Sequence, residues 1–115
     1  MKIYYREKSG GIEILRCFGI EGRVEIPGMI DDKLVISAAP YAFSSHMDEK
    51  EELKNASLWE VSEGLGFGRE EHVLAGNDVE EIVFPYTLKE IGRYIFYGCG
   101  NLKKLELSDS LMQIG

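Results

Sequence analysis

The feature that most constrains the fold is a pattern that recurs every 23 residues. The segments NASLWEVS (55–62), DVEEIVFP (78–85) and NLKKLELS (101–108) align in one frame without gaps. Each begins with a small polar residue and carries apolar residues at its second, fifth and seventh places: Ala56, Trp59, Val61, Val79, Ile82, Phe84, Leu102, Leu105 and Leu107. This spacing predicts a strand in each copy, with the fifth and seventh residues facing inward.

One copy cannot bury its apolar side alone, so the copies are expected to stack with their strands paired in parallel. The copy that starts at Asp78 also shows the return half of the repeat. There Gly92 is expected to adopt a backbone conformation that is costly for other residues. The segment YIFYGC (94–99) is expected to form a short helical turn that buries Phe96 and Cys99.

An earlier segment, VEIPGMIDDKLVISAAPYAFSS (24–45), restates the same elements with five extra residues around Asp-Asp-Lys. Those extra residues predict a turn between two short strands. The following stretch SSHMDEKEELKNAS (44–57) contains good helix formers after possible serine N-caps, so we predict a short helix. At the start of the chain, alternating apolar residues on either side of EKSGG predict a hairpin that caps the first open edge of the stack.

At 115 residues the chain is expected to form a single domain. Its predicted parts are a hairpin cap (1–19), a first coil with insertions (20–54), a degenerate repeat (55–77), a repeat (78–100) and an incomplete repeat (101–115).

The last repeat stops at Gly115, which matches Gly92 in the frame. Leu105, Leu107, Leu111 and Ile114 are therefore expected to be covered by a neighbouring coil on one side only. Two alternatives follow: the natural protein continues with further repeats, or the open edges of two copies meet in a homodimer.

Charge and composition limit the partners. The formal net charge is -7, which disfavours nucleic acid and anionic membranes, and no apolar run is long enough for a membrane span. Between Asp48 and Glu81 there are 11 acidic and three basic residues, so the acidity is concentrated in one sector. The first residues lack the apolar core of a secretory signal, and a cytoplasmic location is expected.

The stretches IPGMIDDKLVISAAPYAFSS and FPYTLKEIGRYIFYGCGNLKKLELSDSLMQIG resemble the BspA-like leucine-rich repeat family of bacteria. In that family's repeat a strand ends in proline, a Ser-Leu or Thr-Leu pair leads to Ile-Gly, and an aromatic turn ends in cysteine and asparagine. The resemblance implies an α/β fold, namely a small right-handed leucine-rich-repeat solenoid with the hairpin as its N-terminal cap. It also implies partner binding, and for surface members a place on the cell surface.

The histidines and cysteines are the candidates for catalysis and metal binding. Cys17 and Cys99 have no CxxC or histidine spacing around them, which disfavours a zinc site or a disulfide framework. Cys99 falls at a core position of the repeat, where thiols are inert. We therefore predict no enzymatic activity, no catalytic residues, no metal and no cofactor. The alternative is a small enzyme or metal-binding domain that uses His72, Cys99 and nearby carboxylates.

Binding is expected instead on the outward positions of the stacked strands or in the acidic sector. In-register parallel pairing would place Glu80 beside Lys103 and Glu81 beside Lys104. These pairs either only fix the register or form part of a binding face for a protein partner, which the net charge allows to be basic. The candidate residues of that face are Glu60, Glu80, Glu81, Val83, Lys103, Lys104 and Glu106.

Overall fold

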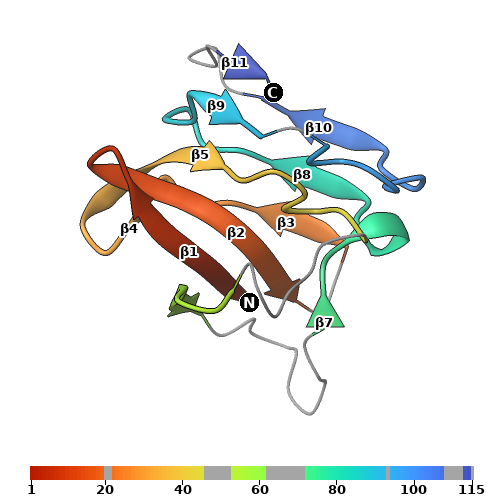
Figure 1. Ribbon diagram of the computed structural model, residues 1–115. Helices are drawn as coiled ribbons and strands as arrows, with labels where there is room; N and C mark the ends of the chain where they lie inside the picture. Colours follow the sequence, from red (N-terminus) through yellow and green to blue (C-terminus); the bar gives the residue numbers. More distant parts are fainter. Residues whose placement is uncertain (20–21, 46–52, 62–71, 93, 108–112, 115) are drawn as a thin grey trace.

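The computed structural model describes residues 1–19, 22–45, 53–61, 72–92, 94–107 and 113–114. The regular elements of these residues are short β-strands and one 3-10 helix, η1 (Gly76–Asp78). The strands form two sheets that face each other (Figure 1). No α-helix occurs among the described residues, so the α/β class expected from sequence is wrong for them. Most of the helix predicted over 44–57 lies outside the described residues, and residues 53–55 form a turn.

The small sheet contains the strands that the repeat frame predicted in the copies at 78–85 and 101–108, together with the strand of the first coil. Its order is β10-β8-β3, with β10 spanning Lys104–Glu106, β8 spanning Glu81–Val83 and β3 spanning Arg23–Glu25. Both pairings are parallel, and they align Val24, Ile82 and Leu105 in one row across the sheet. The predicted parallel pairing of residues 79–84 with 104–107 is therefore confirmed.

The large sheet has the order β11-β9-β5-β2-β1-β6, and β4 and β7 pair at its sides. Its strands are β1 (Lys2–Lys8), β2 (Gly11–Gly19), β4 (Met29–Ile30), β5 (Lys33–Ala38), β6 (Ser57–Glu60), β7 (His72–Val73), β9 (Glu90–Ile91) and β11 (Gln113–Ile114). The return segments β5, β9 and β11 pair in parallel, so the chain passes repeatedly from the small sheet to the large one. Outside the middle repeat, the two halves of each repeat therefore stack in separate sheets.

Both predicted hairpins are present. Strands β1 and β2 pair antiparallel around Ser9 and Gly10, which have positive φ angles of 52° and 82°. The turn between β4 and β5 likewise has Asp31 and Asp32 at φ angles of 52° and 60°. These successive left-handed residues match the twist of a tight hairpin. Strand β2 also pairs in parallel with β5, so the first hairpin extends the large sheet at the edge of β5.

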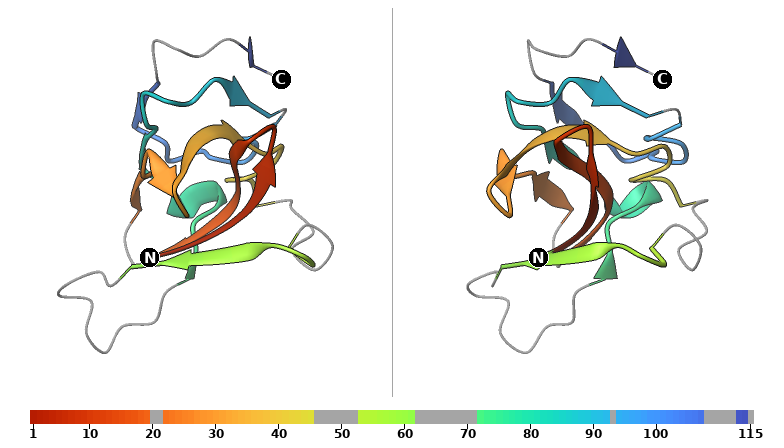
Figure 2. Two further views of the ribbon diagram at one scale, coloured as in Figure 1. Left: turned by 90° about the vertical axis from the view of Figure 1, so that its left-hand side faces the viewer. Right: turned by 60° about the vertical axis from the view of Figure 1, so that its left-hand side comes forward.

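The middle repeat does not lie where the frame placed it. Its strand β6 pairs antiparallel with β1, and β3 pairs directly with β8 (Figure 2). The aromatic turns explain this arrangement: Phe43 stacks on Phe96 with ring centroids 6.5 Å apart, and Tyr41 meets Tyr94 at 5.4 Å. The middle copy has Val73 at the position of Phe96, so it has no ring to insert between these pairs.

Gly92 is required for a different reason from the one predicted. Its φ angle is not positive, but a Cβ atom there would lie 2.2 Å from the backbone nitrogen of Pro40. The close approach of the two return segments therefore excludes a side chain. Tyr41 and Tyr94 instead are left-handed, with φ angles of 62° and 57° at matching positions of their repeats, and Gly98 in the second turn has a φ angle of 84°.

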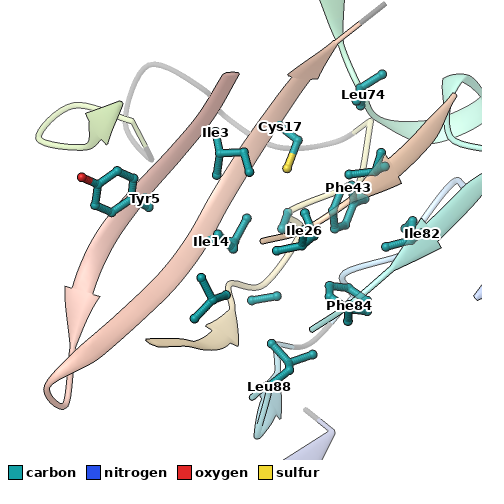
Figure 3. Close-up of a cluster of buried hydrophobic side chains, with 14 of the residues drawn as sticks. Ile3, Tyr5, Ile14, Cys17, Ile26, Phe43, Leu74, Ile82, Phe84 and Leu88 are labelled. Atoms are coloured by element: carbon teal, nitrogen blue, oxygen red, sulfur yellow. The ribbon is translucent and has the colours of Figure 1, made fainter. Parts of the chain in front are cut away.

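The core lies between the two sheets (Figure 3). Side chains of the first hairpin, including Ile3 and Ile14, point toward Ile82 and Phe84 of the repeat at 78–100. The turn at 94–99 forms i to i+3 hydrogen bonds and buries Ile95, whereas Phe96 and Cys99 are only partly buried against the core. The helical turn that was predicted to bury both of them is therefore a series of turns with a different residue inside.

Candidate binding surface

The outward side chains of the small sheet form two rows across its three strands. One row contains Arg23, Glu81 and Lys104, and the other contains Glu25, Val83 and Glu106. We call these six residues the strand face. The inward residues between them face the core, because side chains alternate along a strand. The repeat frame therefore produces a surface on which the order of the side chains is fixed by the strand register.

Charges on the strand face are paired within and between strands. Glu81 lies between Arg23 and Lys104, with oxygen–nitrogen distances of 3.5 Å and 3.6 Å. Arg23 also pairs with Glu25 at 3.0 Å, and Lys104 with Glu106 at 3.5 Å. Exposed ion pairs such as these contribute about 0–1 kcal/mol each, so they fix the register more than they stabilise the fold. Their solvent-exposed groups remain accessible to a partner.

The structure brings most of the predicted site residues together. Glu81 pairs with Lys104 as predicted, and the N–H of Lys103 donates to the carbonyl of Glu80 at 2.7 Å. Glu60 is the exception, since it lies on β6 opposite Lys2 in the large sheet. The prediction that it joins this strand surface from the preceding coil is wrong, because β6 pairs with the hairpin.

Arg23 and Glu25 were missed by the sequence analysis, although they occupy the strand face. A signal for them existed, because Val24 matches Ile82 at an offset of 58 residues. The same offset assigns Arg23 to Glu81 and Glu25 to Val83, as the observed register does.

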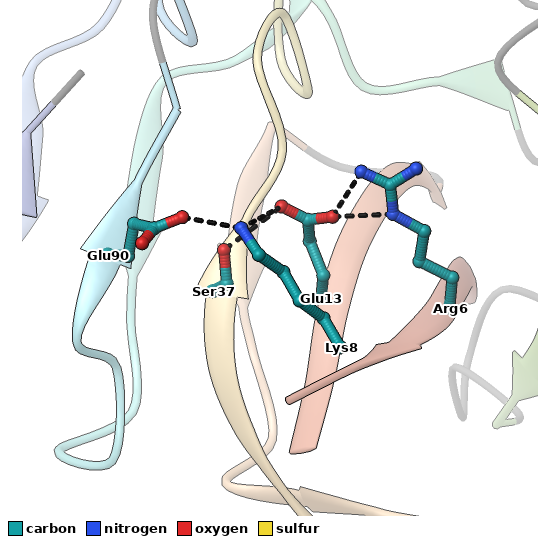
Figure 4. A network of polar contacts seen from close by, with 5 residues as sticks. All are labelled: Arg6, Lys8, Glu13, Ser37 and Glu90. Atoms are coloured by element: carbon teal, nitrogen blue, oxygen red, sulfur yellow. Dashed lines mark hydrogen bonds and ion pairs between the residues drawn. The ribbon is translucent and has the colours of Figure 1, made fainter. Parts of the chain in front are cut away.

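A buried carboxylate lies on the large sheet, away from the core (Figure 4). Glu13 of β2 is 1% exposed. Its Oε2 accepts a 2.6 Å hydrogen bond from Nε of Arg6, and its Oε1 accepts bonds from Ser37 at 3.1 Å and Lys8 at 3.4 Å. Lys8 also bonds Glu90 of β9 at 2.6 Å. Two cations and a hydroxyl thus compensate the burial of this charge.

The pKa of Lys8 is raised above 10.5, first by its hydrogen bond to Glu90 and then by the charges of Glu13 and Glu90, against a lowering by burial. Because the pKa of Lys8 is higher in the folded chain than in the unfolded chain, its protonation stabilises the fold. This contribution is fully present below pH 10.5 and is lost as the pH rises through the folded-state pKa. We expect the free energy of unfolding to fall above that pH, and to fall less in Lys8→Gln. Urea denaturation of both chains on either side of pH 10.5 checks this, and equal falls would contradict it.

The cysteines are placed as structural thiols. Burial raises the pKa of Cys17 to about 12 and also raises the pKa of Cys99. The Cys99 thiol donates a 3.2 Å hydrogen bond to the carbonyl of Phe43. His72 lies on the exposed strand β7, opposite Gly19. Among the described residues no group of three or more His, Cys, Asp and Glu side chains is placed to hold a metal ion.

Thiol reactivity is expected to follow these environments, since the thiolate is the reactive form. In the folded chain at about pH 8, Ellman's reagent should modify Cys99 slowly and leave Cys17 unmodified until the chain is unfolded in urea. The variant Cys99→Ser should show no reaction before unfolding. Rapid modification of two thiols in the native chain would contradict this assignment.

An apolar hollow of about 400 Å³ lies beside β10 and the second aromatic turn. Its lining residues are Ile91, Gly92, Tyr94, Ile95, Phe96, Tyr97, Leu105 and Leu107. Leu105 and Leu107 are 36% and 43% exposed, in agreement with the expectation that they are covered on one side only. In the part of the chain that the structure describes, no helix is long and apolar enough to cross a membrane.

Stacked parallel strands with a 23-residue repeat and a charged outer row are typical of the leucine-rich-repeat fold. The family described as BspA type leucine rich repeat region (6 copies) matches residues 70–115. Residues 70–115 are thus similar to BspA-type leucine-rich repeats.

A crystal structure of a leucine rich repeat protein from T. pallidum has the same fold, with a TM-score of 0.66 and 23% sequence identity. The similarity covers 96% of this chain and 38% of the T. pallidum chain. No curated protein matches the sequence.

Proposed function

We propose that the chain is a non-catalytic protein-interaction module that binds a protein partner on the strand face. The observation that carries the proposal is the pair of aligned rows of outward side chains on β3, β8 and β10. Repeat proteins commonly use such surfaces, since stacking presents side chains at regular spacing without a closed pocket. In this reading the chain forms part of a right-handed solenoid, and the first hairpin caps the edge of β5.

Val83 is the middle residue of its row on the strand face, and it is the position that the test changes. It is half-buried and lies between Glu25 and Glu106, the two carboxylates of its row. Apolar residues surrounded by charges are typical of the centre of a protein interface. A basic partner is favoured because the net charge of the chain is -7 and opposite charge accelerates encounter.

The test is affinity purification from a bacterial lysate with the wild-type chain, Val83→Arg and Leu34→Arg. Leu34 is an exposed residue of the β4–β5 hairpin, so it is a matched control for adding an arginine elsewhere. We expect a partner that is retained by Leu34→Arg, lost by at least about tenfold with Val83→Arg, and bound more slowly as salt is raised. Equal retention by both variants would place the binding site outside the strand face.

The rival function is an enzyme or metal-binding domain that uses His72 and Cys99. The combined variant His72→Ala/Cys99→Ala distinguishes the two. Under our proposal it keeps the partner, and loss of a turnover activity with the fold intact would overturn the proposal.

A further inference from the structure

The two outer strands of the small sheet differ in how well they are covered. Val24 on β3 is fully buried, whereas Leu105, which occupies the same row on β10, is 36% exposed. Within the described residues β10 is the last strand of its sheet on this side. An uncovered edge of this kind is a template for pairing with another strand.

The hydrogen bonds of β10 determine which backbone groups point to this edge. The N–H of Lys104 donates to the carbonyl of Glu80, and the carbonyl of Glu106 accepts from the N–H of Phe84. Both groups therefore point toward β8. Because the bonding direction alternates along a strand, the N–H and C=O of Leu105 point away from β8, toward the open edge.

We propose that a second copy of the chain occupies this edge, with the two β10 strands antiparallel and Leu105 opposite Leu105 of the other copy. The two leucines would then exchange both of their outward hydrogen bonds, which is the closely bonded pair of an antiparallel ladder. The resulting two-fold symmetric contact joins the two small sheets into one continuous sheet. This inference does not depend on the partner proposed for the strand face.

The charges next to Leu105 identify the occupant as a second copy. In the sequence Lys104-Leu105-Glu106, an antiparallel pair centred on the leucine places each lysine opposite the glutamate of the other copy. All four side chains lie on the outward face of the joined sheet. The edge is therefore complementary to itself, and a register shifted by one residue would lose the match.

The apolar hollow supports the same geometry. It lies on the inward side of β10, where Leu105 and Leu107 meet Ile91 and Phe96. A two-fold axis perpendicular to the joined sheet keeps the inward faces of both copies on the same side. The two hollows then become neighbours, and their exposed leucines are removed from water together.

The charge complementarity can be tested by mixing variants. Lys104→Glu alone leaves like charges opposite each other in a dimer of itself, and so does Glu106→Lys. We expect the wild-type chain to dimerise with rising concentration and each single variant to remain monomeric under the same conditions. A mixture of the two variants should form the heterodimer, because every cross-strand pair is then complementary. Sedimentation velocity and native mass spectrometry measure these states.

The matched control is Arg23→Glu on β3, which also loses an ion pair to Glu81 but lies at the opposite end of the small sheet, where Val24 is buried. It should dimerise as the wild type does. The double variant Lys104→Glu/Glu106→Lys should also dimerise, since it restores the opposite charges in a dimer of itself. A wild-type chain that stays monomeric at millimolar concentration, or a mixture without heterodimer, would overturn the proposal.

Discussion

Replacing Phe43 with alanine is expected to remove about 3–5 kcal/mol from the free energy of unfolding. The side chain is fully buried, and its ring meets Phe84 at a centroid distance of 6.1 Å and Phe96 at 6.5 Å. Its loss leaves a cavity where the first coil (20–54) meets the repeat at 78–100. Since a domain of this size has about 5–15 kcal/mol of stability, most of the margin would disappear. Urea denaturation followed by tyrosine and tryptophan fluorescence measures the change.

The control for this prediction is Leu34→Ala, at an exposed position of the β4–β5 hairpin. It should cost less than about 1 kcal/mol, because little apolar surface is buried there. A loss for Phe43→Ala no larger than that of Leu34→Ala would show that the aromatic stack does not hold the repeats together.

The double variant Arg6→Gln/Lys8→Gln is expected to lose about 3 kcal/mol of stability. It leaves the carboxylate of Glu13 buried without either of its cations, and an uncompensated buried charge is costly. The estimate is at the low end of the usual range because the side chains of Arg6 and Lys8 are 54% and 38% exposed. Thermal and urea unfolding at neutral pH give the difference.

Adding Glu13→Gln to this double variant should restore most of the lost stability. The glutamine keeps the shape of the side chain and can still accept the hydrogen bond of Ser37, but it carries no charge. If the triple variant were as unstable as the double variant, the loss would come from the packing of the Arg6 and Lys8 side chains rather than from the buried charge.

The small sheet could be predicted because the sequence pattern that forms it recurs at a fixed spacing. Residues at fixed offsets must face the same way when copies stack, so the pairing of Glu81 with Lys104 follows from counting. The two hairpins were predictable for a local reason, since Ser9-Gly10 and Asp31-Asp32 adopt the left-handed conformations that tight turns need.

The placement of the middle repeat was not predictable from its own residues. Its strand pattern fits the frame, but whether a copy enters the stack depends on rings contributed by other segments, such as Phe43 and Phe96. The burial of Glu13 likewise depends on residues that are distant in the sequence. Alternation gives it an outward position, and its burial results from side chains on β1 and β5 and not from its sequence neighbours.

The direct pairing of β3 with β8 also affects the order in which the sheet assembles. The loop between these strands has 55 residues, and the loop between β8 and β10 has 20. Closing the longer loop costs about 0.9 kcal/mol more chain entropy. Strands β8 and β10 should therefore pair before β3 joins them. Deleting residues between β6 and β7 shortens the longer loop, so it should raise the refolding rate. Folding would then begin at the repeats nearest the C-terminus and finish at the hairpin, in the reverse of the order of synthesis.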